Sequence, residues 1–254
     1  MNRVSGVIIC HNEEKNIEEC IKSILWCDEV VIIDSFSTDE TLNIAGKYTV
    51  KIFQHKWNGF SEQRKYALTK AGYDWILVID SDERCTTELQ KEIKSMLEKE
   101  CIPENGFEIP RKSFFLDKWI KHGGWYPNYQ LRFFRKAFAD VTERLVHESY
   151  YVTGQTGKMK NDILHYTVSS ISDYVNKINS YSDQSAAEKA GKKNITYFDI
   201  FIMPRIAFFQ QYILKGNFLD GLGGLMVSQF HMITKILNNM KIRELQNKND
   251  IQNK

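Results

Sequence analysis

The sequence lacks the patterns that assign a protein to several common classes. Its five cysteines are an odd number and include no Cys-x-x-Cys pair, which argues against a disulfide framework and indicates a reducing compartment. The formal net charge is only +2 and the basic residues are dispersed, so we expect no nucleic-acid partner. No Gly-x-Gly-x-x-Gly follows the first apolar segment, which argues against a dinucleotide-dependent oxidoreductase.

Length and composition are those of a globular protein. The chain has 254 residues, of which 43% are hydrophobic and 26% charged. These values suit one sizeable α/β core with an appendage and exclude a disordered or collagen-like chain. The first apolar run, Val4 to Cys10, is too short and too soon followed by polar residues to be a signal peptide. We therefore expect a cytoplasmic protein.

Strand and helix patterns alternate over the first hundred residues. Val4 to Cys10 is rich in β-branched residues, as expected of a parallel strand that is covered on both faces. From Ile17, apolar residues recur with the spacing of one helical face. The same alternation predicts strands at 30–33, 50–53 and 75–79, a helix at 61–71, and helices started by capping boxes at 37–40 and 87–90. An α/β fold with a mostly parallel sheet follows from this order.

The pattern changes after Pro103. Short strands are predicted at 106–109, 130–135 and 150–153, without long helices between them. A helical stripe returns at Ile171, and apolar and aromatic residues dominate residues 197–239. The second half is therefore expected to begin β-rich and to end in helices.

An acidic turn, Asp80-Ser81-Asp82-Glu83, follows the strand predicted at 75–79. Two carboxylates at such a turn suit Mg²⁺ or Mn²⁺, which prefer oxygen ligands and are often held jointly with phosphates. Taken alone, the pattern is more often an inert solvated turn. Ligands of open α/β sheets bind at the carboxyl ends of the strands, and Asn12 and Asp34 also follow predicted strands. We therefore expect three turns to converge on one site.

Four segments in this order carry a family resemblance. They are Cys10–Glu14, Asp34–Asp39, Gln63–Leu68 and Asp80–Asp82, and together they resemble inverting glycosyltransferases of family 2, which have the GT-A fold. The resemblance implies that Asn12 and Glu13 contact the nucleoside, that Asp34 reads the uracil, that Arg64 helps to hold the base, and that Asp80 and Asp82 serve the cation and diphosphate. The family commonly has a second acid after its second strand, where this chain has Ser35. Capping of the following helix is the alternative role of Asp34, and a surface ion pair is that of Arg64.

Motifs of the second half resemble the bacterial lipopolysaccharide core β-1,4-glucosyltransferases within family 2. They are Gly123–Pro127, Gln130–Phe134, Val146–Glu148 and Gly216–Gly221. The resemblance implies a UDP-sugar donor, with glucose favoured, and a lipid-linked saccharide acceptor such as lipopolysaccharide or lipooligosaccharide core. It also implies a GT-A domain over 1–168, with a nucleotide-binding half at 1–102 and an acceptor half at 103–168, followed by a helical region at 169–254.

Inverting transfer needs a base that takes the proton from the acceptor hydroxyl. Glu148 is the first candidate and His147 the second, because family 2 enzymes draw their base from the β-rich half. Either residue could instead be a hydrogen-bonding partner of Arg132 or Arg144. His165 is a candidate third ligand of the cation, and a satisfied core histidine is the alternative.

The C-terminal region has no uninterrupted run of about twenty apolar residues, the length that a membrane-spanning helix needs. Residues 198–214 and 218–237 are apolar but broken by polar and charged side chains. An amphipathic region lying on the anionic inner face of the cytoplasmic membrane fits this pattern. Packing on the core or against a partner subunit is the alternative, and the oligomeric state is left open.

Two other functions compete with glycosyl transfer. A sugar-phosphate nucleotidyltransferase would need a glycine-rich, basic phosphate loop after the first strand, and residues 11–16 offer none. A non-catalytic carbohydrate-binding protein would not need Asp80, Asp82 and Arg64 together.

Overall fold

The computed structural model describes residues 2–49, 51–142, 149–191 and 194–252. The chain divides into two compact units. The first comprises Met1–Lys112 with Pro127–His165, and the second comprises Ser113–Tyr126 with Tyr166–Lys254.

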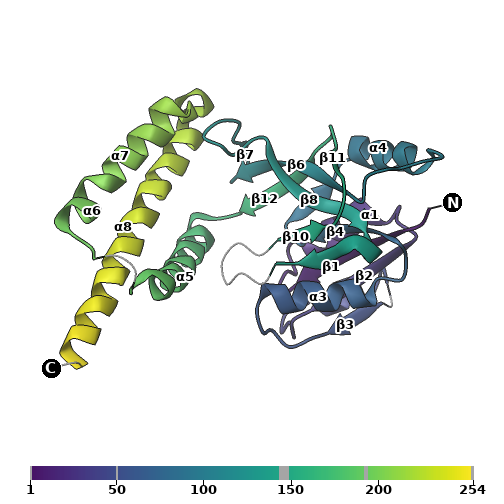
Figure 1. The fold of residues 1–254 in the computed structure, drawn as a ribbon, viewed down its shortest axis with the longest axis horizontal. Helices are drawn as coiled ribbons and strands as arrows, with labels where there is room; N and C mark the ends of the chain where they lie inside the picture. The colour runs from purple at the N-terminus through teal and green to yellow at the C-terminus, as the bar shows by residue number, and fades with distance from the viewer. Residues whose placement is uncertain (1, 50, 143–148, 192–193, 253–254) are drawn as a thin grey trace. The chain divides into compact units, whose positions relative to one another are not determined.

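A mixed sheet forms the centre of the first unit (Figure 1). Its order is β3-β2-β1-β4-β8-β6-β12-β5. The first four strands in this order are parallel, whereas β8 runs antiparallel to both β4 and β6. The α/β prediction is confirmed, and its parallel part is the half built from the first eighty residues. The strands are β1 (Val4–Cys10), β2 (Glu29–Asp34), β3 (Ile52–Gln54), β4 (Trp75–Asp80), β5 (Glu83–Cys85), β6 (Gly106–Phe115), β8 (Asn128–Arg135) and β12 (Ile163–Val168).

Smaller strands complete the β structure. β7 (Lys118–Trp119) pairs with the end of β6, and β11 (Thr156–Lys158) pairs with its beginning. β9 (Ala139–Val141) follows the short 3-10 turn η1 (Lys136–Phe138) and pairs with β10 (Tyr150–Val152) in a separate two-stranded sheet.

Four helices accompany the parallel strands: α1 (Ile17–Ile24), α2 (Thr41–Ala45), α3 (Phe60–Lys70) and α4 (Thr87–Leu97). The capping box predicted at 87–90 is wrong by one residue, because Thr86 is the N-cap and its side chain accepts a hydrogen bond from Leu89 N. The box predicted at 37–40 is also wrong. α2 begins only at Thr41, and the Ser37 hydroxyl is instead held by the carboxylate of Asp34.

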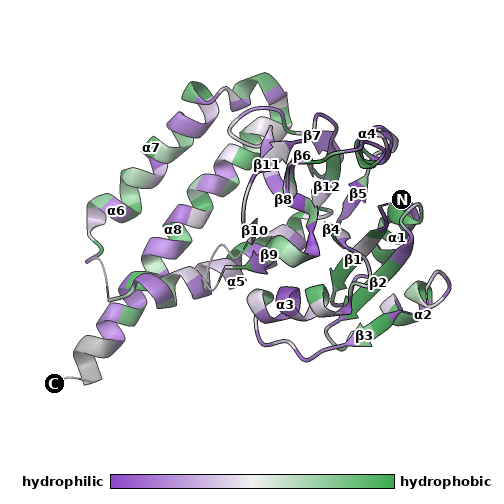
Figure 2. Cartoon of the chain, turned by 45° about the vertical axis from the view of Figure 1, so that its right-hand side comes forward, coloured by the Kyte–Doolittle hydropathy of each residue, from purple (hydrophilic) through white to green (hydrophobic). Residues whose placement is uncertain are grey.

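The core of the first unit consists of apolar side chains on both faces of the sheet. β1 and β2 are buried almost throughout, as the hydrophobic colouring of both strands in Figure 2 reflects. On one face, Trp75 of β4 stacks on Phe133 of β8 with ring centroids 4.8 Å apart. This pair ties the two halves of the sheet together where β4 meets β8.

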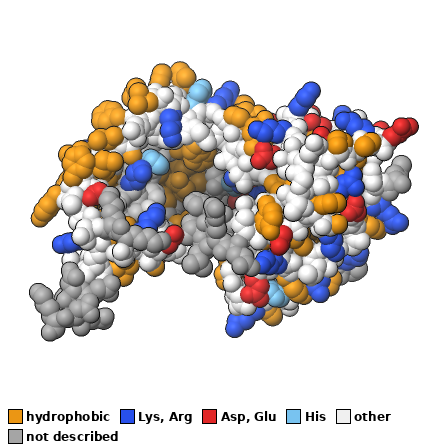
Figure 3. Space-filling view, in the orientation of Figure 1, with side chains coloured by type: hydrophobic (Ala, Val, Ile, Leu, Met, Phe, Trp, Pro, Cys, Tyr) orange, Lys and Arg blue, Asp and Glu red, His pale blue; other side chains and the backbone are white. Residues whose placement is uncertain are grey.

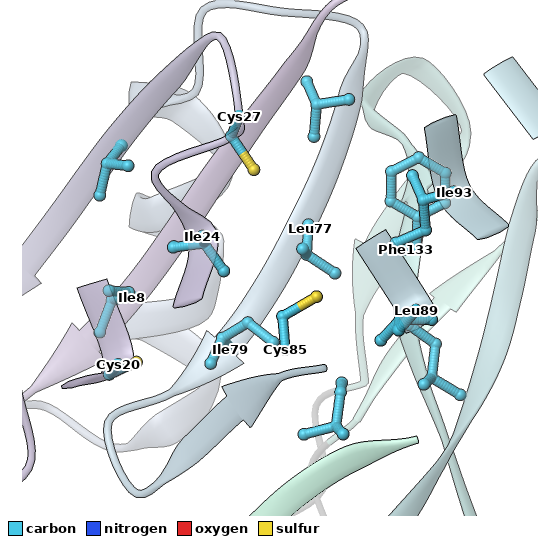
Figure 4. Close-up of a cluster of buried hydrophobic side chains, with 14 of the residues drawn as sticks. Ile8, Cys20, Ile24, Cys27, Leu77, Ile79, Cys85, Leu89, Ile93 and Phe133 are labelled. Atoms are coloured by element: carbon cyan, nitrogen blue, oxygen red, sulfur yellow. The ribbon is translucent and has the colours of Figure 1, made fainter. Parts of the chain in front are cut away.

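The buried cysteines belong to this core. Cys20, Cys27 and Cys85 lie among isoleucine and leucine side chains (Figure 4). Burial raises the pKa of the Cys85 thiol to about 12 and that of the Cys20 thiol well above its usual value. These thiols therefore stay protonated and pack as small apolar groups.

The second unit is built on helices. They are α5 (Ile171–Lys189), α6 (Tyr197–Phe201), α7 (Met203–Phe209), the π-helical turn η2 (Gln210–Leu214), the 3-10 turn η3 (Asn217–Asp220) and the long α8 (Gly221–Gln252). α8 packs against α5 and α7. Within the described residues, no helix is both long enough and apolar enough to cross a membrane.

Two of the motifs that suggested the resemblance meet inside this second unit. Gly123 N donates to Lys215 O at 2.9 Å, and the ring of His122 lies 3.0 Å from the carboxylate of Asp220. Nearby, Trp125 packs against Phe115 in an apolar cluster of the second unit. These contacts of the two motifs, together with their neighbours His122 and Lys215, hold the loop before β8 against η3.

Candidate active site

The acidic turn lies at the edge of the sheet where three neighbouring parallel strands end. The register pairs Cys10 of β1 with Asp34 of β2, and Ile9 of β1 with Asp80 of β4. The turns that follow these strands therefore start at nearly the same level. The predicted convergence of the three turns is confirmed, and this edge is where ligands of open α/β sheets bind.

Hydrogen bonds join the turn after β1 to the turn after β2. Asn12 has a positive φ of 54°. Its backbone N donates to Ser37 Oγ at 2.8 Å, and its Oδ1 accepts from Thr38 N at 2.8 Å. Glu13 N donates to Thr41 Oγ1 at 2.8 Å. Asn12 and Glu13, for which nucleoside contacts are predicted, thus fix the shape of the edge.

Asp34 is fully buried at the end of β2. Its carboxylate accepts from Ser37 N at 2.9 Å, from the Ser37 hydroxyl, and from Gln54 Nε2 at 3.2 Å. These bonds are those of a turn-shaping aspartate. In this structure Asp34 shapes the turn that carries Ser35 and Phe36.

Phe36 is a feature of this turn that the sequence analysis did not single out. Its side chain is 54% exposed, and its backbone has a positive φ of 60°. A bulky residue with positive φ is uncommon, and such backbone strain occurs most often at functional sites. The sequence signal was an aromatic residue inside an otherwise polar turn.

Arg64 of α3 is close enough to the acidic turn to act on its charge. Its guanidinium lies 5.5 Å from the ring centroids of both Phe60 and Tyr150. The charge of Arg64 is also among those that lower the pKa of Asp80. The structure therefore brings together Arg64 and Asp80, which are sixteen positions apart in sequence.

Asp80 is paired with a buried arginine of β8. Arg132 is only 4% exposed and donates to both carboxylate oxygens of Asp80. Burial raises the pKa of Asp80, but the charge and hydrogen bonds of Arg132, with smaller effects from Arg64 and Arg111, outweigh it and lower the pKa to about 2. Asp80 is therefore an anion over the whole physiological range of pH.

Glu83 links the acidic turn to two arginines. It is fully buried, and its Oε1 lies 2.8 Å from Arg132 Nη2 and 3.3 Å from Arg111 Nη1. Its Oε2 accepts from Asp80 N at 3.0 Å. Arg132 thus has two carboxylate partners among the described residues. Arg132 stands between Leu131 and Phe133, so a buried guanidinium that needs a partner could be expected, but the sequence does not indicate which carboxylate that partner is.

Asp82 projects from the same turn toward β12. His165 of β12 is in register with Glu83 of β5, and its Nε2 lies 3.4 Å from Asp82 Oδ2. The side chain of Asp82 is 22% exposed and that of His165 is 13% exposed. His165, the predicted third metal ligand, therefore contacts the acidic turn directly.

The donor set suits a cation that has few protein ligands. Over the described ranges, no group of three or more His, Cys, Asp or Glu residues is arranged to hold a metal ion. Asp80 and Asp82 nevertheless present hard carboxylate oxygens at one turn, with Asp80 shared with Arg132. Such a pair fits Mg²⁺ or Mn²⁺ that takes its remaining ligands from phosphate and water.

Both candidates for the catalytic base, Glu148 and His147, lie outside the described residues, as does Arg144. The nearest described residue after them is Ser149, followed by Tyr150 of β10. Among the described residues, Arg132 has Asp80 and Glu83 as carboxylate partners.

Comparisons with known proteins show what the chain is similar to. The model of glycosyl transferase family 2 matches residues 5–146. An uncharacterized glycosyltransferase of Rickettsia bellii is 30% identical over 260 residues, which cover 96% of this chain and 87% of that protein. The lipopolysaccharide core biosynthesis glycosyltransferase LpsC of Rhizobium meliloti is 26% identical over 250 residues, covering 94% and 91%. Among solved structures, residues 1–349 of TarS from S. aureus align with a TM-score of 0.48 at 16% identity, covering 97% and 92%.

Proposed function

The chain belongs to glycosyltransferase family 2 and has a GT-A-like α/β fold, and from this premise we propose that it transfers a hexose, with glucose favoured, from a UDP-sugar to a lipid-linked saccharide. Lipopolysaccharide or lipooligosaccharide core is the proposed acceptor, and the cytoplasmic face of the membrane is the proposed place of the reaction. A relative named as a lipopolysaccharide core glycosyltransferase, similar over 94% of this chain, supports the acceptor.

The observation that carries the proposal is the position of Asp80 and Asp82. They stand at the sheet edge where β1, β2 and β4 end, and the charge of Arg64 acts on Asp80. A nucleoside diphosphate bound along this edge would meet carboxylates for a cation and a guanidinium for its own negative charge. The nucleotidyltransferase alternative has no comparable support, because the family match is to glycosyltransferases.

The donor nucleoside is proposed to lie on the turns after β1 and β2. Asn12 and Glu13 would contact it, and Asp34 would serve uracil recognition. Since Asp34 is buried and bonded to Ser37 and Gln54, we infer that it acts by fixing the backbone of the turn rather than by offering a carboxylate oxygen.

Asp82 and Asp80 are the proposed ligands of Mg²⁺ or Mn²⁺, with His165 beside Asp82. A cation bound there would supply neutralisation of the charge that develops on the departing diphosphate. Arg132 holds Asp80 in place through two hydrogen bonds. The guanidinium of Arg64 would stabilise the same developing charge.

The acceptor hydroxyl oxygen attacks the anomeric carbon from the face opposite the diphosphate. The new C–O bond forms as the bond to the diphosphate oxygen breaks, and the configuration inverts. The hydroxyl proton goes to a base, for which Glu148 is proposed first and His147 second.

The test is a panel of nucleotide sugars offered with Mg²⁺ or Mn²⁺, scored by thermal stabilisation and by release of the nucleoside diphosphate. Asp82→Asn should reduce that release by at least about 100-fold, while the melting temperature without donor stays unchanged. Asp74→Asn is the matched control, because Asp74 precedes the same strand at its opposite end and is 55% exposed. Turnover of Asp82→Asn within about threefold of wild type would refute the role of Asp82. Stabilisation by a nucleoside triphosphate but by no nucleotide sugar would refute the proposed reaction.

A further inference from the structure

In the second unit, α7 and η2 have their large apolar side chains on the outside. The helical face that carries Pro204, Ala207 and Gln211 is buried, and α7 and η2 both pack against α8. The opposite face is exposed and carries large apolar residues at i, i+4, i+7 and i+11. They are Ile202, Ile206, Phe209 and Ile213. An amphipathic helix of a globular protein buries such a stripe, so this arrangement is the reverse of the usual one.

The exposed apolar stripe continues at both ends. Tyr197 on α6 is 85% exposed, Leu214 at the end of η2 is 79% exposed, and Leu222 at the start of α8 is 70% exposed. Figure 3 shows hydrophobic side chains gathered over α6 and α7. We call this region the apolar face. It consists of Tyr197, Phe198, Phe201, Ile202, Met203, Ile206, Phe209, Ile213, Leu214, Phe218, Leu219 and Leu222.

In the segment between Tyr197 and Leu222, the exposed charged side chains are cationic. Its two acids, Asp199 and Asp220, are buried. Asp199 accepts hydrogen bonds from Thr196 in the capping box of α6, and Asp220 accepts from the backbone N of His122. Its two cations, Arg205 and Lys215, are exposed. The surface between Tyr197 and Leu222 is therefore apolar, aromatic and cationic.

We propose that the apolar face docks on an anionic lipid bilayer, with its aromatic and aliphatic side chains among the headgroups and upper acyl chains. Arg205 and Lys215 then face the lipid phosphates. Their positive charges draw the protein from solution toward the anionic surface. A second copy of the chain fits less well. A symmetric dimer would place the same patch on both sides of the interface, so the cations of both copies would enter it without an exposed acid of this segment to pair them.

This proposal goes beyond the transfer reaction and does not depend on it, because bilayer binding requires neither the donor nor the acidic turn. It assigns the membrane-facing surface of the chain to α6, α7, η2 and η3.

The test is flotation of the full chain with vesicles of phosphatidylcholine, alone or with about one third phosphatidylglycerol. Wild type should float with the anionic vesicles, and Phe209→Gln/Leu214→Gln should lower the partition coefficient at least tenfold. Leu25→Gln/Phe138→Gln is the matched control, because Leu25 and Phe138 are 47% and 42% exposed in the first unit. The control should bind like wild type. Failure of wild type to float, or equal binding by Phe209→Gln/Leu214→Gln, would overturn the proposal.

A second variant, which lacks the two cations, measures the electrostatic contribution to bilayer binding. Arg205→Gln/Lys215→Gln should weaken binding to anionic vesicles by about fivefold for each cation removed, whereas Lys91→Gln/Lys99→Gln on and after α4 should not. Equal binding of wild type to neutral and anionic vesicles would overturn the assignment of an anionic bilayer. Sedimentation without lipid tests the other occupant. A wild-type dimer that Phe209→Gln/Leu214→Gln converts to monomer would overturn the proposal in favour of a second copy.

Discussion

Replacing Arg132 by Met should destabilise the first unit more than any loss of a surface ion pair. Arg132 is 4% exposed and is shared by Asp80 and Glu83. Removing it leaves the fully buried carboxylate of Glu83 with one arginine, Arg111, at 3.3 Å. Asp80 loses both of its guanidinium hydrogen bonds.

The expected loss of unfolding free energy depends on the partners that Asp80 and Glu83 keep once Arg132 is removed. Removing one partner of a buried ion pair costs about 3 to 5 kcal/mol, because the other charge stays buried without compensation. Glu83 keeps Arg111 and the backbone N of Asp80, and the Asp80 side chain is 36% exposed and can take up water. We therefore expect a loss at the lower end, about 3 kcal/mol.

Urea unfolding followed by tryptophan fluorescence measures this loss, because Trp75 lies in the core beside β8. Lys158→Met is the control. Its ion pair with Glu108 spans 3.8 Å between side chains that are 61% and 39% exposed, so its loss should stay below about 1 kcal/mol. A loss below about 1 kcal/mol for Arg132→Met as well would refute the reasoning.

The same variant has a pH signature. The folded pKa of Asp80 is lowered to about 2, so its ionised form contributes stability that is present above the unfolded pKa of about 4. That contribution is lost as the pH falls from about 4 toward 2. Arg132 is the main cause of the lowered pKa. The acid-induced loss of stability should therefore be shallower in Arg132→Met than in wild type, and equal slopes would contradict the assignment.

Two further pairs of variants test local geometry by thermal unfolding. Gly123 and Gly124 both have positive φ, but a Cβ on Gly123 would lie 1.9 Å from Asn217 Oδ1, whereas a Cβ on Gly124 meets nothing within 4 Å. Gly124→Ala should cost about 1 kcal/mol and Gly123→Ala at least about 2 kcal/mol more; equal effects would contradict the packing of this loop on η3. Thr86→Ala should cost about 1 kcal/mol through loss of the α4 cap, and Thr87→Ala should cost close to nothing. A larger loss of stability for Thr87→Ala than for Thr86→Ala would instead support the capping box predicted at Thr87.

The parallel half of the fold could be predicted because its signals are local. The strands β1, β2 and β4 consist mostly of apolar residues, and a polar turn follows each of them. Parallel neighbours end at one edge, so the convergence of Asn12, Asp34 and Asp80 followed from strand order alone. The two capping boxes predicted at Thr87 and Ser37 were wrong because in each case one side-chain hydrogen bond has a different partner. Adjacent threonines at 86 and 87 give the same capping pattern, and Ser37 had a competing partner in Asp34.

The arginine pairing could not be predicted because it depends on a distant strand pairing. β8 lies antiparallel to β4, with Leu77 opposite Phe133 and Ile76 opposite Phe134. Arg132 reaches Asp80 across 52 positions of sequence. Nothing in the Gln-Leu-Arg-Phe-Phe motif states which strand will lie beside it. The role of the acidic turn as part of a charge network is therefore a property of the sheet.

The pairing also changes what the acidic turn offers to the proposed donor. A turn of unpaired carboxylates would repel the anionic diphosphate of a nucleotide sugar. Asp80 and Glu83 are balanced by Arg132 and Arg111, and Asp82 lies against His165. Because Asp80 and Glu83 are paired with arginines, a diphosphate bound at this edge as proposed would meet little uncompensated negative charge, and Arg64 would add a positive contribution. The acidic turn is therefore suited to an anionic ligand because two of its three carboxylates are held by arginines from β6 and β8.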